Sequence, residues 1–184
     1  MNRCRWCNPN NPLYVRYHDE EWGKPKTDDP YLFEMLLLES FQAGLSWECI
    51  LNKRENFRRA FDGFDAVKIA AYDSEKVERL CREPGIVRNR RKISASIRNA
   101  AVFLKIQKEY GTFFEYLKAM GGNITVYEHD RTHSDFSDRL SADLKKRGMS
   151  FVGTTIMYAF LQATGFVDSH EPSCFLYAGE KSFL

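Results

Sequence analysis

The two ends of the chain each carry half of a possible metal site. Cys4 and His18 stand near the N-terminus, while His170 and Cys174, spaced as His-x3-Cys, stand near the C-terminus. Together they make a Cys2His2 set, which is the ligand type and number that suit structural, tetrahedral zinc. Because binding of such an ion would contribute free energy to folding, this set predicts a fold in which zinc joins the segments 4–18 and 170–174.

The same residue types allow other interpretations. Cys4 and Cys7 are spaced as Cys-x2-Cys, so either thiol could be the N-terminal sulfur ligand. His129 and His133 also have metal-like spacing, but the stretch 128–138 is polar and we expect solvated loop histidines there. A free cysteine is often simply a small buried hydrophobe. On spacing alone, the four residues could therefore be unrelated.

The length and composition exclude several classes of protein. The chain has 184 residues, which suits a single domain over 1–184 with a proper core. No apolar run approaches the ~20 residues of a membrane span. The first ten residues include Arg3 and Arg5 and no apolar stretch, so we expect no signal peptide. Five cysteines are an odd count without the density of a disulfide scaffold, so we expect a reducing, cytoplasmic environment.

Helical patterns cover most of the chain. Asp29-Pro30 predicts a helix start, with a capping carboxylate before proline, and Gly44 ends that helix. Ser46 is expected to cap a following helix that extends to Phe61. Further helices are expected over 88–110, from 112 (a capping box with Glu115), from 137 or 141 to 147, and over 153–165. Gly121-Gly122-Asn123 breaks the pattern, and a polar loop is expected to about 135. The predicted fold class is therefore all-α.

Glu39 is a charged residue at a position where the helical pattern predicts an apolar one. It follows Leu32, Met35 and Leu36 at helical spacing, so its carboxylate shares an apolar face. A buried carboxylate is costly unless it is paired, so the pattern indicates either an ion pair or a carboxylate that lines a ligand pocket. Trp47 is near enough along the chain to line the same cavity.

The segment 141–165 has the pattern of two helices joined by a glycine-bracketed turn. Gly148 and Gly153 bracket the turn, basic residues precede it, and Thr154 and Thr155 begin the second helix. Exposed backbone N–H groups at such a turn suit a phosphate, as in a helix-hairpin-helix that grips the DNA backbone. An ordinary connection between helices is the alternative. A second basic cluster at 88–92 favours a local polyanion footprint on a chain whose formal net charge is only +2.

Several blocks of the sequence together resemble the DNA-3-methyladenine glycosylase I family, which repairs alkylated DNA in bacteria. The blocks that carry this resemblance are Cys4-Arg5-Trp6, 17–23 (YHDEEWG), Leu38-Glu39, 42–47 (QAGLSW), 53–56 (KREN), 145–148 (KKRG), 151–156 (FVGTTI) and His170-x3-Cys174. They span nearly the whole chain. The resemblance implies a compact, all-helical fold of the helix-hairpin-helix glycosylase type with one structural Zn²⁺ on Cys4, His18, His170 and Cys174, which leaves Cys7 as a free thiol.

The resemblance also implies an activity and a set of site residues. The activity is the flipping and hydrolytic release of 3-methyladenine from double-stranded DNA, by an enzyme expected to be monomeric. Trp47 would stack on the base and Glu39 would accept hydrogen bonds from its edge, while Tyr17 and Trp6 would complete the walls. The turn Gly44-Leu45 would wedge into the duplex.

Some features depart from the family pattern or stay open. Phe41 stands where smaller or amide residues are typical, and it could alter the pocket or pack outside it. Asp168 resembles the catalytic aspartate of related glycosylases only superficially, so whether Glu39 or Asp168 orients the water is open. The segment 123–138 matches nothing in the family. Two alternative functions therefore remain, a non-catalytic helix-hairpin-helix DNA-binding protein and a glycosylase with shifted alkylpurine specificity.

Overall fold

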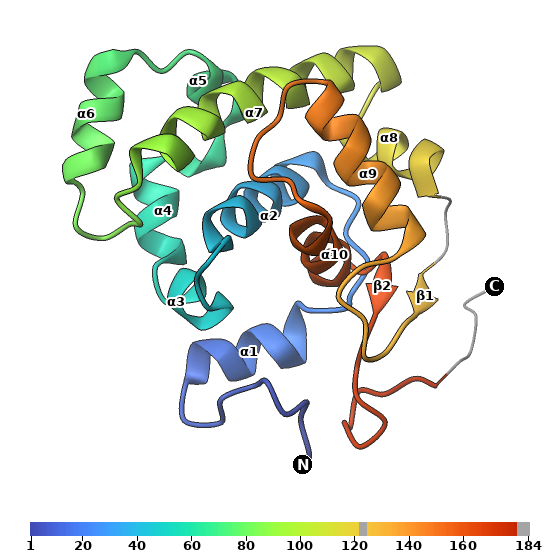
Figure 1. The fold of residues 1–184 in the computed structure, drawn as a ribbon. Coiled ribbons are helices and arrows are strands. Elements are labelled where there is room, and N and C mark those ends of the chain that lie inside the picture. Colours follow the sequence, from blue (N-terminus) through green and yellow to red (C-terminus); the bar gives the residue numbers. More distant parts are fainter. Residues whose placement is uncertain (122–124, 180–184) are drawn as a thin grey trace.

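The computed structural model describes residues 1–121 and 125–179, and these form a mostly helical fold around a central pair of helices (Figure 1). The elements are α1 Pro12–Glu20, α2 Asp29–Gln42, α3 Trp47–Leu51, α4 Arg54–Ala60, the 3-10 turn η1 Asp62–Phe64, α5 Ala66–Ala70, α6 Ser74–Arg82, α7 Arg90–Tyr110, α8 Phe113–Gly121, β1 Val126–Tyr127, α9 Asp135–Lys146, α10 Thr154–Ala163 and β2 Val167–Asp168.

Helix α2 forms the centre of the core. Every residue from Leu32 to Phe41 is buried, and the helix packs against α7, α8 and α10. A helix that is apolar all round is stable only when it is covered on all sides. Glu39 lies within this run, so its burial follows from the position of α2 in the fold.

The start of α2 differs from the prediction by one residue. Asp28, rather than Asp29, caps the helix, and its carboxylate accepts a hydrogen bond from the Tyr31 amide at 3.0 Å. Asp29 instead caps a different helix, because its carboxylate accepts hydrogen bonds from the amides of Phe113 (2.8 Å) and Phe114 (3.1 Å) at the start of α8. The pattern Asp-Asp-Pro therefore stabilises two helix ends that lie far apart in the sequence.

Other predicted boundaries are confirmed in part. Ser46 caps α3 through the Cys49 amide at 3.2 Å, but the helix expected to reach Phe61 is divided into α3 and α4. Gly111 ends α7 with a φ of 88°. The last predicted helix pair is present as α9 and α10, although α9 begins earlier than expected, after a reciprocal serine cap at Ser134. Helices α1, α5 and α6 were not predicted.

The fold is mostly helical, but β1 and β2 add a short parallel pair that the sequence analysis did not predict. Val126 pairs with Val167 and Tyr127 with Asp168, so the polar stretch before α9 is not all loop. Strands of two residues are too short to give an alternating pattern, which is why the sequence did not reveal them. The predicted break at Gly122 and Asn123 lies outside the described residues. The pairing places the segment after β1 beside the residues that lead to His170.

Within residues 1–121 and 125–179, no helix combines the length and the hydropathy that a membrane crossing requires.

Candidate active site and metal centre

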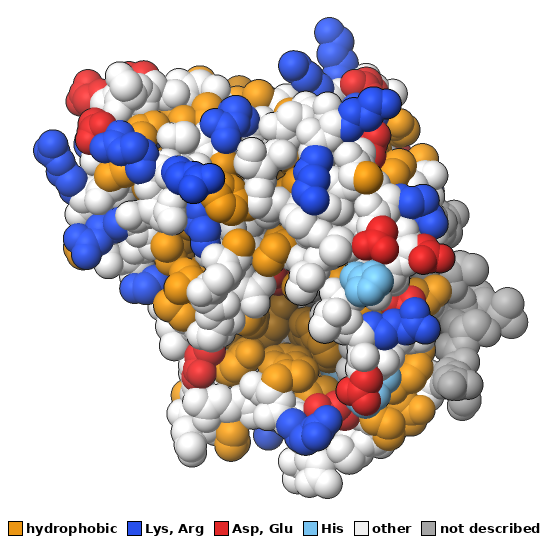
Figure 2. Space-filling model, viewed as in Figure 1, with side chains coloured by type: hydrophobic (Ala, Val, Ile, Leu, Met, Phe, Trp, Pro, Cys, Tyr) orange, Lys and Arg blue, Asp and Glu red, His pale blue; other side chains and the backbone are white. Residues whose placement is uncertain are grey.

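A cavity of about 290 Å³ opens between α1, α2, α10 and the segments that follow β1 and β2. Figure 2 shows it as a hollow with a floor of hydrophobic side chains. Its lining is rich in aromatic and polar side chains: Trp6, Tyr14, Tyr17, Trp22, Glu39, Gln42, Trp47, His129, Asp130, Arg131, Ala159, Gln162, Ser169 and Glu171. All four residues expected to form a base pocket, Trp6, Tyr17, Glu39 and Trp47, are among them.

Two groups of contacting aromatic rings line this cavity. The Tyr17 and Trp47 rings lie 5.3 Å apart between centroids with planes inclined by 47°. Trp6 contacts Trp22 edge-on at 4.8 Å and Tyr14 at 5.2 Å. Aromatic pairs in such tilted arrangements stabilise one another. The cavity therefore has preformed faces on which a flat ligand can stack.

Glu39 is a buried acidic residue of the cavity lining. Its residue is only 3% exposed, and its Oε2 atom is buried without a hydrogen-bond partner among the described residues. Burial disfavours the charged form and raises the pKa of Glu39 to about 8. The Trp47 Nε1 donor is also buried and lacks a partner in the described part of the chain. An unpaired acceptor and an unpaired donor at one cavity are the features of a ligand site.

Several lining residues were missed by the sequence reasoning. Tyr14 lies three residues before Tyr17 on α1, and Gln42 lies three residues after Glu39 on α2, so helical spacing could have identified both. Trp22 belongs to the motif 17–23 but received no role. Local spacing did not indicate that His129 and Arg131 line the cavity, because the pairing of β1 with β2 places their segment beside distant residues.

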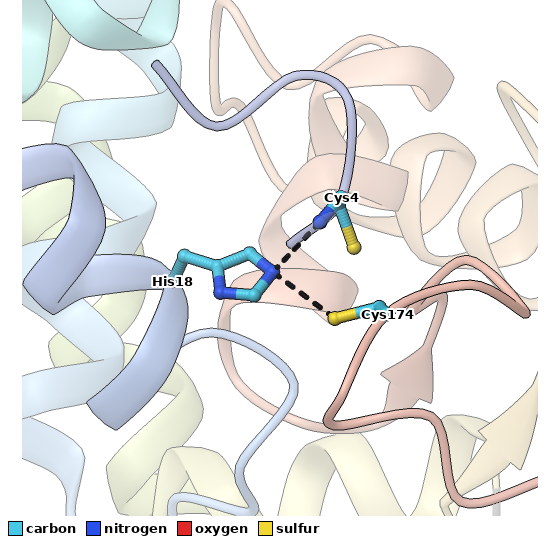
Figure 3. A group of neighbouring side chains, drawn as sticks. All are labelled: Cys4, His18 and Cys174. Atoms are coloured by element: carbon cyan, nitrogen blue, oxygen red, sulfur yellow. Dashed lines mark hydrogen bonds between the residues drawn. The ribbon is translucent and has the colours of Figure 1, made fainter. Parts of the chain in front are cut away.

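Three of the four predicted metal ligands form a cluster. The Cys4 Sγ, His18 Nε2 and Cys174 Sγ atoms lie within 4.8 Å of one another, and all three residues are buried (Figure 3). The Cys174 Sγ atom is 3.5 Å from His18 Nε2. Backbone amides donate to both sulfurs, from Glu171 to Cys4 at 3.4 Å and from Leu176 to Cys174 at 3.5 Å.

His170 lies beside this cluster rather than within it. Its ring centroid is 5.4 Å from that of His18, and its Nε2 atom is buried with no partner among the described residues. Its Nδ1 atom lies 2.7 Å from Asp168, just as His18 Nδ1 lies 2.8 Å from Asp19. A carboxylate on the far nitrogen is the usual partner of a metal-binding histidine. The orphaned Nε2 atom and the paired carboxylates fit a fourth ligand.

The other candidate metal ligands have separate environments. Cys7 is buried, but its Sγ atom lies 3.8 Å from the Tyr14 carbonyl oxygen and not in the cluster. His133 is exposed and pairs with Asp138 at 3.2 Å, as expected for a solvated loop histidine. His129 lies in a loop with its side chain 26% exposed, pairs with Asp130 at 3.2 Å, and in addition lines the cavity.

The turn between α9 and α10 (147–153, the α9–α10 turn) has the expected glycine geometry. Gly148 adopts a φ of 103°, which a residue with a side chain rarely adopts. Gly153 is the N-cap of α10 and gives its first amides no side-chain acceptor. The Thr154 hydroxyl, however, donates to Asp138 and lies 3.0 Å from the Ser137 hydroxyl, so it stabilises the helix pair internally. The Thr155 residue is exposed.

The turn between α2 and α3 (43–46, the α2–α3 turn) is exposed beside the cavity. Gly44 has a φ of 80°, and Leu45 is a large apolar residue that is 41% exposed. Gln42, the last residue of α2, lines the cavity. An apolar side chain therefore projects at the edge of the pocket, where a wedge was expected.

Phe41 and Asp168, whose roles the sequence left open, both lie outside the cavity lining. Phe41 points into the core, where it packs against Phe57 at 4.8 Å and Phe61 at 5.7 Å, and it is not among the cavity-lining residues. The bulky substitution is thus accommodated outside the pocket. Asp168 is 7% exposed and accepts hydrogen bonds from the His170 backbone (3.0 Å) and ring, which ties it to the histidine rather than to the cavity.

Known proteins share both the sequence and the fold. The family model described as methyladenine glycosylase matches residues 6–177. DNA-3-methyladenine glycosylase 1 of Escherichia coli is 46% identical, over 98% of this chain and all of that protein. A crystal structure of a 3-methyladenine DNA glycosylase I is 44% identical and superposes with a TM-score of 0.91, over 96% of this chain and 100% of that one.

A third similarity concerns ligand recognition. The Staphylococcus aureus enzyme, whose structure was described for its recognition of 3-methyladenine, is 39% identical with a TM-score of 0.88, over 95% of each chain. The sequence and the helical fold are those of a DNA base glycosylase. This chain belongs to the methyladenine glycosylase family.

Proposed function

We propose that this chain hydrolyses the N-glycosidic bond of 3-methyladenine in alkylated double-stranded DNA, the first step of base-excision repair. One observation carries the proposal: the rings of Trp6, Tyr17 and Trp47 surround a single cavity that also holds the unpaired carboxyl of Glu39. The names of the relatives support the same reaction, and one similar structure was described for recognition of 3-methyladenine.

The cavity favours the alkylated base through its charge. Methylation at N3 gives adenine in DNA a positive charge, and an indole face attracts a cationic ring more strongly than a neutral one. Trp47 and Tyr17 supply the stacking faces. Glu39 accepts hydrogen bonds from the base edge, and the incoming cation favours its ionised form, which burial alone disfavours. Adenine lacks this charge and would gain less.

The reaction needs little acid catalysis. The bond between C1′ and the base nitrogen breaks with its electron pair passing to the base, which leaves as neutral 3-methyladenine. A water oxygen bonds to C1′ and releases its proton to solvent, leaving an abasic site. The protein's part is to hold the base outside the stack and to place Glu39 near the positive charge. We assign no role in water activation to Asp168, because His170 occupies its Oδ1 atom.

DNA is held by the two exposed turns. We infer that α9, the α9–α10 turn and α10 act as a helix-hairpin-helix, in which the uncapped amides at Gly153 and Thr155 bind a backbone phosphate. Because the Thr154 hydroxyl is engaged with Asp138, only its backbone is available for this contact. Leu45 of the α2–α3 turn would fill the gap left by the flipped base. Both turns adjoin the face on which the cavity opens (Figure 2).

A zinc ion fits the cluster at the termini. Cys4, His18, His170 and Cys174 would hold it, supported by the orphaned Nε2 atom of His170 and by the carboxylates behind both histidines. When bound, the ion would be structural and would link the N-terminal and C-terminal segments. The protein's own residues carry out the base recognition.

Base release tests this function directly. Duplex DNA is treated with a methylating agent and incubated with the protein, and freed bases are identified by mass spectrometry. The proposal predicts 3-methyladenine in solution while 7-methylguanine stays in the DNA. Release of 3-methylguanine as well would indicate broader specificity. No release by protein that binds the duplex would instead identify a non-catalytic DNA-binding protein.

A further inference from the structure

Helix α7 contacts both of the turns that are proposed to meet DNA. The α2–α3 turn and the α9–α10 turn belong to segments about 100 residues apart, and no direct hydrogen bond joins them among the described residues. Their separation matters because the wedge must reach the gap in the duplex while the other turn holds the backbone. Another element of the fold must therefore fix the distance between the α2–α3 turn and the α9–α10 turn.

Lys92 holds the α2–α3 turn from the side of α7. Its residue is 7% exposed, and its Nζ atom donates to the carbonyl oxygens of Phe41 at 2.8 Å and Ala43 at 2.6 Å. These carbonyls lie at the C-terminal end of α2, where backbone acceptors lack partners within the helix and carry the negative end of its dipole. In the described part of the chain no carboxylate pairs with this ammonium, and burial lowers the pKa of Lys92.

Asn99 holds the α9–α10 turn from the same helix. Its side-chain amide nitrogen donates to the Ser150 carbonyl at 3.0 Å, and its oxygen accepts from the Ser150 amide at 2.9 Å. Asn99 follows Lys92 by two helical turns and lies on the same face of α7. Lys92 also approaches this turn, because its Nζ atom lies 5.8 Å from the centroid of the Phe151 ring. One buried face of α7 thus binds both turns.

We propose that Lys92 and Asn99 form a rigid bracket on α7 that sets the wedge turn at its working distance from the phosphate-binding turn, and that Lys92 is a positioning residue for base extrusion. The proposal rests on the proposed glycosylase function. Lys92 does not line the base cavity. Its loss should therefore impair the extrusion of a base from the duplex and leave binding of the free base intact.

A positioning role for Lys92 and a purely structural role predict different experimental results. A residue that only stabilises the fold would change the free energy of unfolding, while the folded fraction would bind and react normally. A positioning residue changes the reaction of the folded protein at saturating concentration. A loss of placement distant from the chemistry can reduce a rate by about 100-fold.

The experiment compares Lys92→Met with Lys105→Met, which removes an exposed lysine from the same helix. Three properties of folded, zinc-loaded protein are measured: the single-turnover rate of 3-methyladenine release from a duplex, the affinity for free 3-methyladenine, and the fluorescence of 2-aminopurine placed beside a tetrahydrofuran abasic analogue. The fluorescence rises when an inserted wedge unstacks the probe. Lys105→Met should match the wild type in all three.

For Lys92→Met we expect release to fall by about tenfold or more and the fluorescence rise to shrink, with free-base affinity within about twofold of the wild type. Lys92→Arg keeps the charge and should recover part of both losses. Unchanged release and fluorescence, or an equal loss of free-base affinity, would overturn the bracket. If Lys92→Met does not fold, Asn99→Leu tests the contact of α7 with the α9–α10 turn, and the same losses of release and fluorescence are expected.

Wild-type protein that releases no base would contradict the proposed function, whereas the fluorescence signal would still test the bracket.

Discussion

Trp22 lies edge-on against His170, with ring centroids 4.7 Å apart and planes inclined by 74°. Trp22 lines the aromatic cavity, and His170 lies beside the cysteine and histidine cluster. The same wall continues through Trp6, whose ring is 5.2 Å from that of His18. The cluster at the termini and the aromatic pocket are therefore in direct contact. A substitution in the cluster should alter the packing of the pocket side chains.

Replacing His170 should abolish the proposed zinc binding and lower the stability of the fold. We expect His170→Ala to lose zinc and to lower the melting temperature by about 5–10 °C, because a lost ligand leaves two termini without their link. Elemental analysis and a thermal melt measure the two effects. His129→Ala serves as the control, since His129 lies outside the cluster and should keep the metal. Full zinc content in His170→Ala would show that the ligand assignment is wrong.

Glu39 should make the stability of the fold depend on pH. Burial raises its pKa to about 8 from the ordinary value of 4.5, so between these values the folded protein retains a proton that the unfolded chain has lost. The free energy of unfolding must then fall as pH rises through this window. Glu39→Gln lacks the titrating group and should avoid that loss, becoming more stable than the wild type by about 2–4 kcal/mol above the window.

Urea unfolding at pH 5 and pH 9 measures this difference. The two proteins should be closer in stability at pH 5, where the folded wild type has a neutral Glu39, and should diverge at pH 9. Glu75→Gln, on the exposed side of α6, controls for the general effect of removing one carboxylate. Parallel stability profiles for the wild type and Glu39→Gln would mean that Glu39 is not desolvated as the structure indicates.

Trp47 should contribute to base affinity through stacking. Trp47→Leu removes the indole face while keeping an apolar side chain, and the affinity for free 3-methyladenine should fall by about tenfold or more. Fluorescence or NMR titration gives the dissociation constant. Phe41→Leu is the matched control, because Phe41 packs against Phe57 outside the cavity. Phe41→Leu should reduce stability without changing base affinity. A loss of base affinity in Phe41→Leu but not in Trp47→Leu would contradict the stacking role of Trp47.

Lys145 should contribute to the salt dependence of DNA binding. It is exposed at the end of α9 and lines a basic groove with Arg98 and Gly153 beside the α9–α10 turn. Lys145→Met should reduce the slope of log affinity against log salt concentration by about one unit. Fluorescence anisotropy on an undamaged duplex measures that slope. Lys68→Met, on α5 away from this groove, should leave it unchanged; equal slopes for all three proteins would exclude Lys145 from the phosphate contacts.

The sequence predicted those parts of the molecule that depend on local signals. Gly111 as a helix end and the Ser46 cap follow from backbone geometry near one residue, and both are present. Glu39 was recognised because one charge within an apolar run conflicts with the helical pattern. The four expected pocket residues do meet in one cavity, although the resemblance to a known family, rather than spacing, indicated that they would.

The missed features depend on contacts between distant segments. Asp29 was assigned to the start of its own helix, but its carboxylate caps α8, more than 80 residues away. The β1–β2 pairing, which carries Arg131 to the cavity, involves strands too short to produce a pattern. The engagement of the Thr154 hydroxyl by Asp138 likewise requires two helices to be packed together. Local sequence patterns do not indicate which of these residues contact one another in the folded chain.

The most direct test of the pocket is a titration of free 3-methyladenine into the wild type and Glu39→Gln, followed by NMR, with adenine as the competing ligand. Recognition by the buried carboxyl predicts saturable binding of 3-methyladenine, weaker binding of adenine, and a loss of about tenfold or more in Glu39→Gln with its fold intact. Equal affinity of the two proteins for 3-methyladenine would contradict the assignment of Glu39 and of the cavity as the base-recognition site.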